Sequence, residues 1–186
     1  MRVRWNLVLR EKGIIRMPNL CKSWALIISL MFGPSHSYAA QVITPEYEEP
    51  KVVFDFFFED PQHIASALYW VRSTISPLYD EPYNMAPEMM DVVVMIHGTE
   101  IVTLAKHNYE KYRESVERMK YYHALGVEFR ACSLAARDYS YQPDDLYDFV
   151  TLVPSAPTDL VQLQMQGYAL IVPLVRSKKF SIEEIR

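Results

Sequence analysis

The chain has 186 residues, half of them hydrophobic and 13% aromatic, with 19 basic and 23 acidic residues and a formal net charge of −4. The first 39 residues hold six of the basic and one of the acidic residues, so the remaining 13 basic and 22 acidic residues give a net charge of about −9. An excess of acids this large argues against binding nucleic acid or an anionic membrane surface through overall charge, and the apolar content argues against a disordered chain.

Residues 1–39 have the three parts of a secretory signal peptide. A basic stretch precedes the apolar run ALIISLMFG (25–33), and small residues follow it, with Ser37 and Ala39 before the expected cleavage point. The run is far shorter than the roughly 20 residues that span a membrane. We therefore predict cleavage after Ala39, export to the periplasm and no membrane insertion afterwards. Met17 is an alternative start to Met1, because it shortens an unusually long basic region.

The segment after the predicted cleavage site begins as an extended arm (40–50), and residues 51–186 are expected to form one domain. Residues 51–59 form an apolar run of strand length, and Asp60 and Pro61 are typical of a helix start. Four apolar residues then recur at helical spacing and are expected to face the core: Ile64, Leu68, Val71 and Ile75.

A second buried strand is predicted at residues 91–98, where DVVVMIHG ends in glycine. Residues 100–125 read as one broken helix or two consecutive helices, with Asn108 as a cap between them and Gly126 as the stop. The inward residues of the second part are predicted to be Val116, Met119 and either Tyr122 or His123.

The last third of the chain repeats the alternation of strand and helix. Strands are predicted at 127–132, 148–154 and 168–173, and helices at 133–139 and 155–167. Leu160 and Leu163 face inward in the longer helix, which Gly167 ends, and the tail 177–186 has room for one more helix.

Five apolar strands alternating with helices predict a three-layer α/β/α domain with a five-stranded parallel sheet, whose strand order the sequence does not supply. In such sheets, ligands and chemistry are found beyond the carboxyl ends of the strands. The residues that this rule selects are Glu59, Asp60, His97, Gly98, Thr99, Cys132, Ser133, Pro154 and Ser155.

Cys132 has two interpretations. It is the only cysteine after Cys21 leaves with the signal peptide. The first is a reactive thiol. Cys132 ends a strand and a helix starts at the next residue, so free backbone N–H groups and the helix dipole favour the thiolate. Of the two nearby arginines, Arg130 alternates onto the same face of the strand, and only Arg137, in the following helix, is placed to stabilise the thiolate. The alternative is a small, buried and inert side chain. A useless accessible thiol is a liability in an oxidising compartment, but burial removes that liability too.

Three stretches carry a resemblance to a known family: VVVMIHG, GVEFRACSLAARD and LVPSAPTDLVQLQMQGYALIVP. In order and spacing they resemble the DsrE/DsrF family of sulfur-relay proteins, and within it the exported single-domain branch, over about residues 51–173. In relay members the cysteine matching Cys132 accepts a sulfane sulfur as a persulfide and hands it to the next protein, and the proteins assemble into ring-like oligomers. The best-known relay members are cytoplasmic, and Asp138 stands where many relatives have glycine.

The first functional hypothesis is therefore an exported sulfur-handling protein in which Cys132 carries sulfane sulfur, a carrier or at most a sulfurtransferase-like protein. In this hypothesis His97 hydrogen-bonds or protonates the sulfur, if the sheet places its strand beside that of Cys132. The binding residues are Gly98, Thr99, Ser133 and Arg137. His97 bonded to a backbone carbonyl, and Thr99 and Ser133 as helix caps, stay open as structural alternatives. Expected partners are sulfur donor and acceptor proteins or small persulfides, and further copies in a homo-oligomer.

The second hypothesis is a non-catalytic, oligomeric binding or assembly module that buries an inert Cys132. No cofactor and no metal are predicted, because the sequence has no G-x-G-x-x-G, phosphate loop or H-E-x-x-H motif and no tight histidine pair. Three methionines offer soft ligands for Cu(I) but are more typical of core or oligomer contacts: Met85, Met89 and Met90.

Overall fold

The computed structural model describes residues 40–176 and 179–186, so the predicted signal peptide, Cys21 and both candidate start positions lie outside the described residues. Residues 46–186 form one compact unit, and residues 40–50 contain no helix or strand. Within the described ranges, no helix is both long enough and apolar enough to cross a membrane.

The sheet has five parallel strands, as the apolar runs predicted. They are β1 (Lys51–Phe56), β2 (Asp91–Ile96), β3 (Glu128–Cys132), β4 (Val150–Val153) and β5 (Ala169–Ile171). Their order across the sheet is β4-β3-β2-β1-β5. The order places β1, β2 and β3 side by side in the middle, so the loops that follow these three strands meet at one edge.

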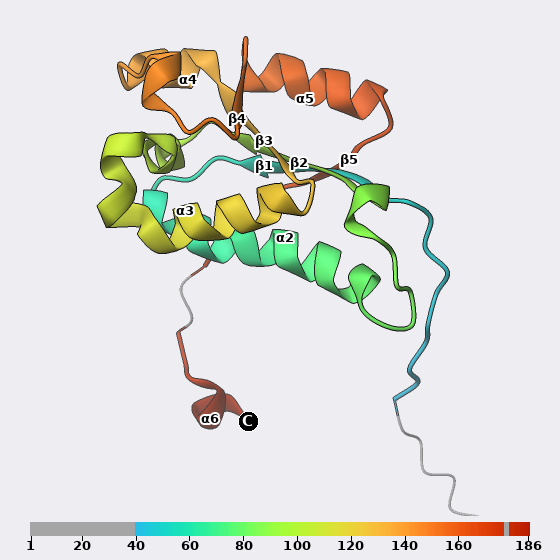
Figure 1. Ribbon diagram of the computed structural model, residues 1–186. Coiled ribbons are helices and arrows are strands. Elements are labelled where there is room, and N and C mark those ends of the chain that lie inside the picture. Colours follow the sequence, from blue (N-terminus) through green and yellow to red (C-terminus); the bar gives the residue numbers. More distant parts are fainter. Residues whose placement is uncertain (1–39, 177–178) are drawn as a thin grey trace, which may run out of the picture. The chain divides into compact units, whose positions relative to one another are not determined.

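Helices cover both faces of the sheet, which confirms the three-layer α/β/α fold (Figure 1). Helices α2 (Ile64–Tyr79) and α3 (Tyr109–Ala124) lie on one face, and α4 (Ser133–Asp138) and α5 (Ala156–Met165) on the other. A last helix, α6, spans Ile182–Ile185. Short 3₁₀ turns join these elements: η1 (Pro61–His63), η2 (Pro87–Met89), η3 (Thr99–Leu104), η4 (Lys106–Asn108) and η5 (Pro143–Asp145).

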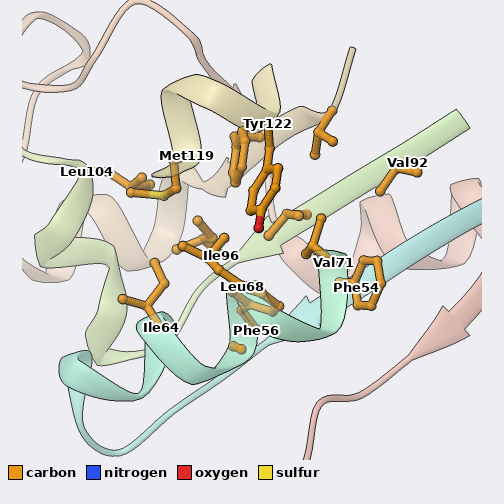
Figure 2. Close-up of a cluster of buried hydrophobic side chains, with 14 of the residues drawn as sticks. Phe54, Phe56, Ile64, Leu68, Val71, Val92, Ile96, Leu104, Met119 and Tyr122 are labelled. Carbon is orange, nitrogen blue, oxygen red and sulfur yellow. The ribbon is translucent and has the colours of Figure 1, made fainter. Parts of the chain in front are cut away.

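The larger core lies between the sheet and helices α2 and α3 (Figure 2). The four α2 residues predicted from helical spacing are buried there, and so are Val116, Met119 and Tyr122 of α3, whereas His123 is exposed. Each large aliphatic side chain buried in this way stabilises the fold by about 1.5–3 kcal/mol relative to its exposed state.

The predicted stop and start signals are largely confirmed. Asp60 accepts the N–H of Gln62 at 2.8 Å, and Gly126 and Gly167 end their helices with φ of +91° and +92°, which glycine adopts at little cost. Asn108 does precede α3, but its amide donates to the Val102 carbonyl at 2.9 Å instead of capping the helix. Residues 99–108 are accordingly two 3₁₀ turns and not a regular helix.

A smaller core lies on the opposite face, where α5 covers the sheet. It contains Val53, Val93 and Met95 from the middle strands, Leu160 and Leu163 from α5, and Cys132 from the end of β3. The cysteine that the sequence singled out is therefore a member of a packed layer.

Candidate functional site

Cys132 is the last residue of β3, and α4 starts at the next residue. Its backbone pairs with Val153 of β4, and the residue is only 4% exposed. Within the described residues it forms no disulfide, and its side chain makes no bond to the start of α4. The thiol is thus free but shielded, at the strand end where the sequence placed it.

His97 follows β2 directly beside Cys132. Strands β2 and β3 are parallel, and Ile96 pairs with Ala131, so the next residue of each strand, His97 and Cys132, continues the same register. Side chains alternate along a strand, and Met95 belongs to the smaller core with Cys132. His97 and Cys132 therefore share one face of the sheet. The strand of His97 lies beside that of Cys132, as the sulfur-handling hypothesis requires.

The imidazole of His97 binds a carboxylate on the other neighbouring strand. Its Nε2 lies 2.6 Å from Oδ1 of Asp55, and the two side chains are 18% and 20% exposed. The Phe57 ring stacks on the imidazole, with centroids 4.9 Å apart and planes inclined by 21°. Because a carboxylate accepts only, Nε2 is the donor to Asp55, and in the tautomer whose single proton lies there Nδ1 is the acceptor. Nδ1 makes no hydrogen bond with any described residue.

A fully buried carboxylate, that of Glu100, holds the loops after β1 and β2 together. Its Oε1 accepts the N–H groups of Gly98 at 2.8 Å and His97 at 3.2 Å, and its Oε2 accepts the N–H of Phe58 at 3.0 Å. Burial raises the pKa of Glu100, and the backbone donors oppose that shift by favouring the ionised form. The backbone that carries His97 and Phe57 is fixed from beneath by this one side chain.

Gly98 and Thr99 belong to the same clamp. A Cβ at Gly98 would lie 2.5 Å from both Glu100 Oε2 and the Phe58 nitrogen, so no larger residue fits without movement. Thr99 Oγ1 donates to the Phe58 carbonyl at 2.9 Å. Both residues thus join the β1 and β2 loops.

Three polar residues of β3 and α4 that the sequence analysis considered, Ser133, Arg137 and Arg130, do not belong to this clamp. Ser133, partly buried, makes no side-chain hydrogen bond in the part of the chain that the structure describes, and Arg137 is exposed there without an ion-pair partner. Arg130 shares the face of Cys132, but its guanidinium binds Glu128 at 2.9 Å through two nitrogens and Asp159 at 2.8 Å. These two acids raise the pKa of Arg130 and neutralise its charge.

The remaining strand-end residues that the sequence selected do not join this group. Asp60 and Ser155 cap η1 and α5, since Ser155 Oγ accepts the Thr158 N–H at 3.4 Å. Glu59 and Pro154 are exposed.

Sequence reasoning missed Asp55, Phe57 and Glu100. A signal for Asp55 existed, because it is a single acid inside the apolar run KVVFDFFF, and a half-buried acid in a central strand calls for a partner. Glu100 gave no such signal, since an acid after a strand-end glycine is ordinarily solvated.

Comparisons with known proteins agree with this fold. The family profile described as the DsrE/DsrF-like family matches residues 51–173. Among solved structures, the protein of unknown function MTH1491 from Methanobacterium thermoautotrophicum is similar, with 23% identity and a TM-score of 0.50 over 67% of this chain and 99% of that one. At that identity the likeness concerns the fold. The search of curated proteins returned no match.

Proposed function

The chain belongs to the DsrE/DsrF-like family, and from this premise we propose that it is an exported, periplasmic sulfur-handling protein whose Cys132 carries sulfane sulfur as a persulfide. The observation that carries the proposal is the free thiol at the end of β3, next in register to His97, whose ring is held by Asp55. Its sulfur donor and acceptor are proteins or small persulfides, and the protein works as a homo-oligomer.

The transfer proceeds by thiol exchange. The Cys132 thiolate attacks the outer sulfur of a donor persulfide, a bond forms between Sγ and that sulfur, and the donor's own sulfur–sulfur bond breaks to release a thiolate. An acceptor thiolate then attacks the outer sulfur of Cys132–S–SH and frees Cys132. Each step exchanges one sulfur–sulfur bond for another, so no oxidant is needed.

The Asp55 and His97 pair supplies the proton handling. His97 Nδ1 takes the thiol proton and returns it to the departing thiolate, while the Asp55 carboxylate holds the ring and stabilises the imidazolium that forms. Gly98 and Thr99 hold the His97 loop, and Ser133 follows the sulfur on α4. Arg137, on the same short helix, attracts an anionic polysulfide.

The burial of Cys132 favours a second candidate, a non-catalytic oligomeric binding or assembly module with an inert thiol. A residue 4% exposed admits a donor only if the neighbouring side chains or α4 move. Free cysteines in packed layers are ordinarily small hydrophobic side chains without chemistry.

Intact-mass spectrometry after brief exposure to polysulfide separates the two candidates. Sulfur handling predicts that the wild type gains the mass of one sulfur atom, that a reductant removes it, and that Cys132→Ser gains none. It also predicts rapid reaction of the native thiol with a small maleimide and slower loading in His97→Gln. If the wild type gains nothing and the thiol reacts only after unfolding, the carrier function is wrong and the assembly module remains.

A further inference from the structure

A cavity of about 340 Å³ lies between α2 and α3, remote from Cys132. Pro87 of η2 and Leu125 complete a lining that comes mostly from the C-terminal parts of both helices: Arg72, Ile75, Ser76, Tyr79, Tyr121 and Tyr122. A helix between two parallel strands runs antiparallel to them, so these helix ends lie toward the amino ends of the strands, whereas Cys132 lies at a carboxyl end. The volume falls within the range of small-molecule sites.

Three hydrogen-bond donors in this cavity have no protein acceptor. The Arg72 guanidinium and the Ser76 and Tyr122 hydroxyls make no side-chain hydrogen bond with any residue that the structure describes, and Arg72 makes no ion pair there. Tyr122 is 5% exposed, with its ring in the core and its hydroxyl directed toward α2 (Figure 2). Burial raises the pKa of Tyr122, and the positive charges of Arg118 and, to a smaller extent, Arg72 oppose the shift.

Arg72 is exposed and makes no ion pair with a described residue, whereas three basic residues of the neighbouring α3 each bind an acid: Arg113, Arg118 and Lys120 pair with Glu110, Glu114 and Glu117. The guanidinium and the hydroxyls on the wall of this one cavity are all donors, and a carboxylate can accept from both kinds of group.

The cavity also offers apolar surface for the rest of a ligand. Tyr79 and Tyr121 are 56% and 61% exposed, and the side chains of Ile75 and Leu125 line the cavity with them. We propose that this cavity binds a small carboxylate with an aromatic body, its carboxyl group on Arg72 and Tyr122 and its ring against Tyr79 and Tyr121. The site is independent of sulfur transfer and stands whichever function Cys132 has.

Titration of the ¹⁵N-labelled protein tests the proposal with benzoate, phenylacetate and 4-hydroxybenzoate as probes. Benzamide, which has the shape of benzoate without its charge, and inorganic phosphate, which lacks the ring, are the matched comparisons. We expect saturable amide shifts in residues 72–79 and 121–125, a dissociation constant below about 1 mM for at least one carboxylate, and binding at least tenfold weaker for benzamide and phosphate.

Two variants test which side chains bind the carboxylate probe. Arg72→Leu should weaken binding of the best probe by about tenfold or more, and Tyr122→Phe by about threefold while its ring stays in the core. Arg113→Leu, on the exposed side of α3, should bind like the wild type. Thermal unfolding of each variant shows that the fold is retained. The proposal is wrong if none of the carboxylates gives a saturable shift up to about 20 mM, if benzamide binds as tightly as benzoate, or if Arg72→Leu has no effect.

Discussion

The N–H of Gly98 donates to the Glu100 carboxylate at 2.8 Å, and a Cβ on the same glycine would lie 2.5 Å from the other oxygen of that carboxylate. A larger residue at position 98 would therefore collide with the Glu100 side chain. Glycine admits the close approach, and the buried glutamate accepts three backbone N–H groups, of which that of His97 also donates to the Phe56 carbonyl at 3.2 Å. Because His97 and Phe58 are two of the donors, Gly98 and Glu100 together set the geometry of the candidate site.

Gly98→Ala is expected to destabilise the fold by about 1–3 kcal/mol, because the added methyl group meets the Phe58 backbone as well as the carboxylate and one of them must move. Urea unfolding measures the change. Gly126→Asn is the control, since nothing lies within 4 Å of a Cβ there and asparagine tolerates the positive φ. An equal cost at both positions would mean that the crowding at Gly98 is relieved without strain.

The pKa of Glu100 predicts a pH-dependent stability. Its folded pKa is raised by burial above the unfolded value of about 4.5. The folded state therefore holds the proton more tightly, and the stability that Glu100 contributes is fully present below that value and is lost as pH rises through the folded pKa. We expect the free energy of unfolding of the wild type to fall across this window relative to Glu100→Gln.

Glu100→Gln should be less stable than the wild type in acid, because one carboxyl oxygen becomes an NH₂ group that faces a backbone N–H. Glu114→Gln, at a site 83% exposed, is the matched control and should follow the wild-type profile. Parallel profiles for the wild type and Glu100→Gln would contradict the raised pKa.

The fold was predictable because its signals are local. Apolar runs marked the strands, and Asp60, Gly126 and Gly167 marked helix ends by backbone chemistry that acts within one turn. The strand order could not be predicted from the sequence, because it depends on which strands pair across long sequence separations. The first part of the helical region predicted at residues 100–125, up to Asn108, is two 3₁₀ turns, because the buried bonds of Glu100 and Asn108 fix its backbone.

The site was predictable only in part, for a related reason. Cys132 and His97 were found from their places at strand ends, and their adjacency followed once β2 was known to lie beside β3. Asp55 contributes because β1 lies on the other side of β2, which no local pattern records. Arg130 was placed on the correct face, but the partner that occupies its charge, Asp159, lies on a helix 29 residues later.

Asp55→Asn tests whether the His97 ring must be held by a charge. The amide offers a weaker acceptor to Nε2–H and does not stabilise an imidazolium, so sulfur loading of Cys132 from polysulfide should slow by about tenfold or more. Quenched-flow mixing followed by intact-mass spectrometry measures the rate of sulfur loading. Asp91→Asn, at the opposite end of β2 in an exposed pair with Lys51, should load at the wild-type rate. Equal rates for both variants would exclude a part for the Asp55 and His97 pair in loading.

The Arg130 and Asp159 pair should contribute to stability because it is sheltered. The guanidinium and the carboxylate are 21% and 15% exposed and lie 2.8 Å apart, and Glu128 fixes the guanidinium from the other side. A double-mutant cycle with Arg130→Met and Asp159→Asn should give a coupling of about 1–2 kcal/mol in urea unfolding. The same cycle at Lys51 and Asp91, half exposed and 3.6 Å apart, should give less than about 1 kcal/mol. If the two couplings were equal, solvent would screen Arg130 as fully as a surface lysine, and its charge would be free to act on the neighbouring thiol face.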